Sequence, residues 1–176
     1  MPDDEPRAYA ASKASSRLYQ REILSGVIER LVRWTGGFGD DAFGFDEIVH
    51  PYAVIVMQDC DPEQDANARV AGGADEGKRQ KSMLPAMLMV VASEFDNATD
   101  LGGSDIKRRA KHNKDERYQF LSAISASDDA LGYGIGSLIL DFKRFFTYRT
   151  EELLRAVERG ETRRRARLIT PYAQQV

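Results

Sequence analysis

Four polar or ionisable side chains, those of Gln58, Asp59, Cys60 and Asp61, directly follow the apolar run 52–57. A short apolar run rich in β-branched residues predicts a buried strand. The four side chains would then lie at the rim of a sheet, where rigid scaffolds commonly display binding groups. If the chain stays extended there, Asp59 and Asp61 point to one side and Cys60 to the other.

This rim has two chemical interpretations. Asp59 and Asp61 could hold a hard divalent cation, provided that further oxygen ligands joined them. Alternatively, both carboxylates cap a turn before Pro62 and Cys60 is a small core residue. We favour the second interpretation, and we expect neither a metal nor another cofactor. A nucleophilic Cys60 would need a nearby base to form the thiolate. The chain offers two histidines for that role, His50 and His112.

Charge is distributed unevenly along the chain. Residues 1–106 hold 10 Lys and Arg against 19 Asp and Glu, a balance of −9, whereas residues 107–176 hold 15 against 9, a balance of +6. A basic half favours either an anionic partner or pairing within the fold, and the run 163–167 could pair with the acidic half. The densest basic segment supplies six predicted nucleic-acid contacts: Lys107, Arg108, Arg109, Lys111, Lys114 and Arg117.

Composition restricts the class of protein. A length of 176 residues fits one domain. The single cysteine excludes an internal disulfide and a cysteine-rich zinc site. The first residues do not form a secretory signal, so we expect a reducing cytoplasm. No apolar run approaches the roughly 20 residues that a membrane-spanning helix needs, so we expect no membrane partner.

Hydrophobic patterning predicts a mainly β (α+β) chain. The predicted strands are 21–31, 52–57, 84–92, 117–121 and 137–147, although a helix fits the first of them nearly as well. Long loops are predicted at 34–45, 62–82 and 125–136. A late helix near 150–159 would have Thr150 as its N-cap and end at Gly160. Together these elements predict a small antiparallel barrel with long loops and a C-terminal helix. We expect residues 17–176 to form this single domain and residues 1–16 to be a flexible N-terminal tail.

Three segments of this pattern resemble the MazF/PemK-like toxins in order along the chain. The segment 21–28 (REILSGVI) is similar to their opening strand, 50–57 (HPYAVIVM) to their second strand, and 137–145 (SLILDFKRF) to their later strand before a helix. The chain also resembles an uncharacterised bacterial group through Q-x-C-D, R-Y-x-x-L, D-F-K-R and R-R-x-R-L-x-x-P-Y motifs. These stand at 58–61, 117–121, 141–144 and 164–172. Both resemblances imply a small barrel with an SH3-like fold.

The resemblance implies two functions. One is an endoribonuclease toxin that cleaves single-stranded RNA by attack of the ribose 2′-hydroxyl. Arg33, Ser93, Asp59 and Asp61 would then lie around the site, with 107–114 holding the strand. The other, which we favour, is a non-catalytic or weakly catalytic binding subunit of a bacterial stress or phage-defence system. It would act as a homodimer or with a protein partner. The predicted interface residues are Trp34, Phe38, Gln58 and Cys60.

Overall fold

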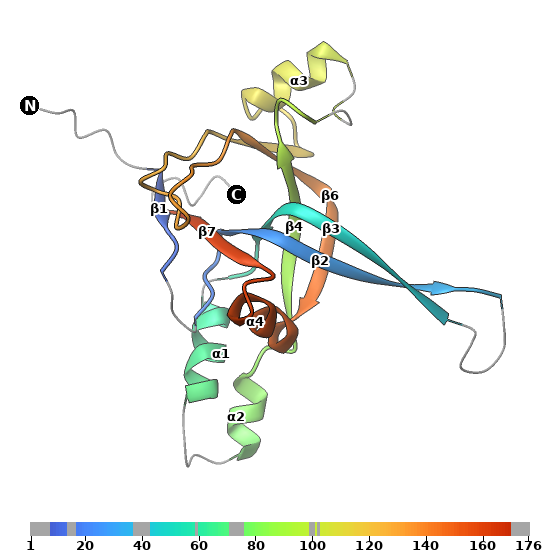
Figure 1. Cartoon of the computed structure of the whole chain (residues 1–176), viewed down its shortest axis with the longest axis vertical. Coiled ribbons are helices and arrows are strands. Elements are labelled where there is room, and N and C mark those ends of the chain that lie inside the picture. The colour runs from blue at the N-terminus through green and yellow to red at the C-terminus, as the bar shows by residue number, and fades with distance from the viewer. Residues whose placement is uncertain are drawn as a thin grey trace, which may run out of the picture.

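The computed structural model describes residues 8–13, 17–36, 43–58, 60–70, 76–98, 101 and 103–169. Figure 1 shows a curved sheet with helices placed around it. The strands are β1 (Tyr9–Ala11), β2 (Glu22–Trp34), β3 (Phe43–Ile55), β4 (Ala86–Glu94), β5 (Tyr118–Leu121), β6 (Leu138–Arg149) and β7 (Arg163–Leu168). The helices are α1 (Cys60–Val70), α2 (Glu76–Ser82), α3 (Ser104–Lys111) and α4 (Thr150–Glu158).

The strands form one antiparallel sheet in the order β1-β7-β2-β3-β4-β6-β5. The edge strands β1 and β5 are not paired with each other among the described residues, so the sheet is not closed into a barrel. Residues 122–136 bridge the two edges instead. The Tyr9 hydroxyl donates to the Ser122 carbonyl over 3.1 Å, and the Ala130 N–H donates to the Arg165 carbonyl over 2.7 Å. The mainly β, antiparallel prediction is therefore confirmed in its coarser form.

The central strands are buried on both faces. Val54 and Val90 belong to one apolar cluster, whereas Ile55 and Met89 belong to a second cluster that includes Leu153 of α4. Successive residues of a strand point to opposite faces, so one run of apolar residues serves both clusters. This double burial explains why β4 and the core part of β3 were recognisable in the sequence as continuous apolar runs.

Strands β2 and β3 extend beyond the rest of the sheet as a two-stranded ribbon (Figure 1). Their ladder runs from Ile23 opposite Val54 to Trp34 opposite Phe43. However, β7 pairs with β2 only over 22–25, and β4 pairs with β3 only over 52–55. Residues 27–34 and 43–50 consequently have no third strand beside them in the described part of the chain. We call these two segments the arm.

Gly26 lies at the root of the arm. Its φ of +71° is in the region that favours glycine, and a Cβ atom there would stand 2.8 Å from the Glu161 carbonyl oxygen. The Thr162 hydroxyl donates to the Gly26 carbonyl over 3.2 Å. A larger residue at position 26 would strain the backbone and displace the segment before β7, so Gly26 fixes where the arm leaves the body.

Several predictions are confirmed and others are wrong. The segments 84–92, 117–121 and 137–147 correspond to β4, β5 and β6, and 21–31 is a strand, not a helix. The loop predicted at 34–45 is wrong at both ends, because Trp34 closes β2 and Phe43 opens β3. The strand predicted at 52–57 begins earlier, at Phe43, and ends at Ile55.

The exposed loop predicted at 62–82 is wrong, because α1 and α2 occupy most of it. Helix α1 buries only Pro62, Asp65 and Ala68, so it lacks the apolar stripe that would have identified it. The late helix is confirmed as α4, but Thr150 is its first helical residue and Arg149 its N-cap. The buried Thr150 hydroxyl has no hydrogen-bond partner among the described residues.

Two consecutive arginines of β7 are buried against carboxylates. Arg164 binds Glu22 of β2, with Nη2 and Oε2 3.0 Å apart. Arg165 forms two 2.8 Å hydrogen bonds to Asp129, which lies in the segment that bridges the sheet edges. The predicted pairing of the run 163–167 with the acidic half is thus confirmed for Arg164, whereas Arg165 uses an acid of the basic half.

Replacing Arg164 with Met should lower the free energy of unfolding by about 3–5 kcal/mol, because it leaves the fully buried Glu22 carboxylate without its charge partner. The double variant Glu22→Leu/Arg164→Met should recover most of that loss. Urea denaturation measures both changes. Asp105→Ala, at the exposed Arg108–Asp105 pair, is the control and should change stability by less than about 0.5 kcal/mol. Unchanged stability of Arg164→Met would contradict the structural role of the pair.

Candidate functional site

One face of the arm carries a cluster of large apolar side chains. Trp34 pairs with Phe43 and Val32 pairs with Phe45, and paired positions two apart share a face of the ribbon. These four side chains expose 59–70 % of their surface. We call this cluster the apolar arm face. Monomeric proteins rarely expose adjoining aromatic residues in this way unless the patch contacts a partner.

Ion pairs accompany the apolar arm face without giving it a net charge. Next to the cluster, Arg30 Nε lies 2.9 Å from Glu47 Oε1. On the opposite face, Arg33 Nε lies 3.0 Å from Asp46 Oδ2. All four side chains are about half exposed, so water screens both pairs and each contributes little to stability. The arm therefore presents balanced charge around an apolar centre.

A two-stranded ribbon is at best marginally stable when it stands alone in water. The distal part of the arm has no packed face against the body, and its outer edges have no strand beside them among the described residues. The energy that holds its shape must come from its root or from something that covers it. This physical deficit marks the arm as the strongest candidate functional site.

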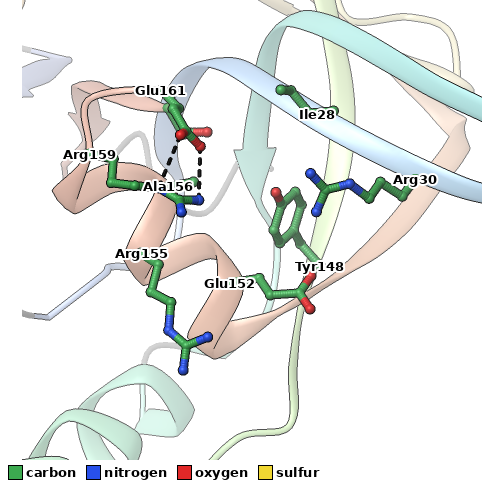
Figure 2. A pocket seen from close by; sticks show the side chains of 9 residues that line it. Ile28, Arg30, Tyr148, Glu152, Arg155, Ala156, Arg159 and Glu161 are labelled. Atoms are coloured by element: carbon green, nitrogen blue, oxygen red, sulfur yellow. Dashed lines mark hydrogen bonds and ion pairs between the residues drawn. The ribbon is translucent and has the colours of Figure 1, made fainter.

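The arm root is fixed against α4 (Figure 2). Ile28 and Arg30 of β2 face Tyr148 of β6 and Glu152 of α4 across a polar pocket of about 150 Å³. Burial raises the pKa of Tyr148. The arginines of this pocket are paired with carboxylates, namely Arg30 with Glu47, Arg155 with Glu151 and Arg159 with Glu161. The pocket therefore lies between the arm and the body, and the charges of its arginines are balanced by carboxylates.

The predicted catalytic residues are not all brought together. Arg33 of β2 pairs with Gly44 near the arm tip, whereas Ser93 of β4 pairs with Ile139 of β6. Gly44 lies eight positions before Tyr52, the residue of β3 that pairs with Ala92. At about 3.3 Å per residue, Arg33 and Ser93 are on the order of 25 Å apart. The structure thus places Arg33 near the tip of the arm and Ser93 in the body of the sheet.

The polar rim at 58–61 begins a helix. Cys60 is the exposed first residue of α1, with its Sγ 3.7 Å from Gln58 Oε1, and Asp61 lies in the first turn. The extended conformation expected here is therefore wrong for Cys60 and Asp61, which are helical. Asp59 and Phe38 lie outside the described residues. Within the described part of the chain, no group of three or more His, Cys, Asp or Glu side chains could hold a metal ion.

The two histidines lie in different parts of the structure. His50 is buried at the arm root, where Nε2 lies 2.7 Å from Glu29 Oε2 and the ring packs 4.9 Å from that of Phe146. His112 is exposed and ends α3. These contacts give His50 a structural role at the arm root.

The predicted nucleic-acid contacts lie on and after α3, but carboxylates pair with three of them. Arg108 pairs with Asp105, and Arg109 with Asp115. Arg117 forms two hydrogen bonds to Asp141, of 2.8 and 2.6 Å. The edge strand β5 brings Arg117 beside Asp141, because the next residue, Tyr118, pairs with Asp141 across the sheet.

Three lysines of this segment are less constrained. Lys107 lies over the ring of Phe95, with Nζ 5.1 Å from the ring centre. Lys111 and Lys114 are exposed and form no ion pair within the described ranges. The basic surface is accordingly weaker than the count of six predicted contacts suggests, and it is centred on these lysines.

A groove of about 870 Å³ lies between α1, α4 and the segment before β6. Val70, Leu131, Leu154 and Val157 supply its apolar lining. Its volume is within the range of small-molecule sites. We treat it as a secondary feature of the body.

Asp141 should make stability depend on pH. Hydrogen bonds from Arg117 hold the pKa of Asp141 below its ordinary value. A lowered pKa contributes stability above the unfolded-state pKa of about 3.9, and that contribution is lost as the pH falls through the folded-state value. The stability difference between the wild type and Asp141→Asn should therefore be largest above about pH 5 and shrink below about pH 4. Urea titrations across this range, with Asp105→Asn as the exposed control, measure it; a difference that grows on acidification would contradict it.

Comparisons with protein-family models, with curated proteins and with solved structures found no match to this chain. Among the described residues, no helix has the length and apolar character needed to cross a membrane.

Proposed function

We propose that this protein is a binding subunit that attaches to a protein surface through its arm and does not act by catalysis. The observation that carries the proposal is the apolar arm face, in which Trp34, Phe43, Val32 and Phe45 stand together in water. Aromatic anchors beside a balanced polar border are the composition typical of a protein interface.

The energetics support this use of the arm. Trp34, Phe43 and Phe45 expose 59–70 % of their surfaces. With about 200 Å² per aromatic side chain, a partner that covered all three would remove about 400 Å² from water. At about 25 cal/mol per Å² this corresponds to roughly 10 kcal/mol before the entropy cost of association. The ion pairs beside them are already formed, so docking leaves no charge unpaired.

The separation of Arg33 from Ser93 also supports a non-catalytic role. A ribonuclease site needs its charge-stabilising groups within hydrogen-bond reach of one phosphate, whereas Arg33 lies near the arm tip and Ser93 lies in the body of the sheet. The resemblance to MazF/PemK-like toxins supports a place for the subunit in a bacterial stress or phage-defence system. The single cysteine fits a reducing cytoplasm.

Phe45→Ser should abolish attachment to the partner without unfolding the body. Truncating a central interface aromatic commonly weakens binding by tenfold or more. Phe45 is 70 % exposed, so its removal leaves no cavity in the core. The measurement is cross-linking and affinity capture from cells of the same organism, with equal circular dichroism of both proteins.

Tyr133→Ser is the matched control for this experiment, because Tyr133 is an aromatic residue that is 84 % exposed and lies outside the arm. It should leave capture unchanged. Equal loss of capture in both variants, or in neither, would refute the arm as the binding element.

RNA binding is a second candidate function, favoured by the exposed lysines of α3. Lysines act as point charges on phosphates, and each phosphate contact on a single strand contributes about 0.7 to the slope of log affinity against log salt. The exposed ring of Tyr133 or of Trp34 could stack on an unpaired base. Cleavage of the RNA would in addition require Arg33 or Ser93 to reach it.

If RNA binds at α3, the double variant Lys111→Gln/Lys114→Gln should lower the salt slope for a single-stranded RNA by about 1.4. Fluorescence anisotropy at several salt concentrations measures the slope, and Lys143→Gln on β6 is the control. Incubation with total RNA beside Arg33→Ala and Ser93→Ala tests cleavage. Wild-type protein that neither binds nor cuts RNA would exclude this candidate.

A further inference from the structure

We infer that the occupant of the apolar arm face is a second copy of this chain, docked through the same face about a two-fold axis. This inference rests on the proposed function and names its partner. Two arms would lie face to face and run in opposite directions, with the axis crossing the ribbon at the Val32–Phe45 pair.

The charge of the arm favours a copy of itself over a charged partner. Arg30 and Arg33 are matched by Glu47 and Asp46, and both pairs form within one arm. Two such arms can approach without a surplus of like charge. A strongly acidic or basic partner would find no complementary field there, because complementary potentials are what select such partners.

The register of the ribbon makes the face self-complementary. On this face, the pair Trp34–Phe43 precedes Val32–Phe45, and the pair Arg30–Glu47 follows it. A two-fold rotation at the middle pair therefore places Trp34 of one copy over Arg30, and Phe43 over Glu47, of the other, so that the two rings cover an ion pair that is already formed. An aromatic ring over a guanidinium is favourable, and Trp is the strongest of these acceptors.

The area matches what a specific dimer requires. The three aromatic side chains contribute about 400 Å² per copy, hence about 800 Å² for the pair. Val32 is 64 % exposed at the centre of the same face, so covering it in both copies brings the total to about 1,000 Å². This is the lower limit for a specific protein interface, which predicts a dimer of modest affinity.

Chemical cross-linking can test the axis directly. Stacked sheets lie about 10 Å apart, too far for a disulfide but within reach of a short bis-maleimide. In a Cys60→Ser background, which removes the single native thiol, Val32→Cys should give a covalent dimer. Leu31→Cys, one residue away on the opposite face of the same strand, should give at least tenfold less. Labelling with a mono-maleimide corrects for any difference in thiol reactivity.

Sedimentation equilibrium supplies an independent readout. The wild type should associate reversibly to a dimer in the micromolar range or above. Phe45→Ser should lower the association constant at least tenfold, whereas Tyr133→Ser should leave it unchanged. Cross-linking at Leu31→Cys equal to that at Val32→Cys would overturn the two-fold arrangement.

The two proposals fail in different ways. If the wild type stays monomeric at several hundred micromolar while Phe45→Ser still abolishes capture of another protein, the second copy is the wrong occupant and the binding function stands. If Phe45→Ser changes neither self-association nor capture, both proposals are refuted.

Discussion

The position of β7 depends on two buried guanidinium–carboxylate pairs. Arg164 and Arg165 are neighbours on a strand and so point to opposite sides, and each finds a single acid there, Glu22 on one side and Asp129 on the other. The first joins β7 to β2, and the second joins it to the segment that spans the two sheet edges. Among the described residues, β1 pairs with no strand but β7, so the charges that position β7 also help to position this edge of the sheet.

The strands of the core were predictable and the arm was not, for one physical reason. Val54 and Val90 belong to segments buried on both faces, so composition alone identifies them. In the arm, apolar and charged residues are mixed on both faces, because only one neighbouring strand is present and the distal part is exposed. The glycines around its tip obscured the strand ends further. Helix α1 was not predicted, because it buries only Pro62, Asp65 and Ala68 and so lacks an apolar stripe.

The candidate site was anticipated only in part. Trp34 was predicted as an interface residue at the start of the aromatic, glycine-rich segment 34–45, which also holds Phe43 and Phe45, but the grouping of these side chains with Val32 was not predicted. Only the cross-strand register places these four side chains on one face, and register is a tertiary property that a single sequence does not specify. The same limit applies to Arg117 and Asp141, whose pairing required the order of the edge strands.

The separation of the arm from the core has an evolutionary consequence. Its distal side chains contact water and one another, not the buried clusters, so substitutions at the tip leave folding of the body almost untouched. Selection can therefore change the arm and the body at different rates. Descendants of one ancestral body could acquire new recognition properties through a handful of tip replacements, while the root glycine and the paired arginines stay invariant.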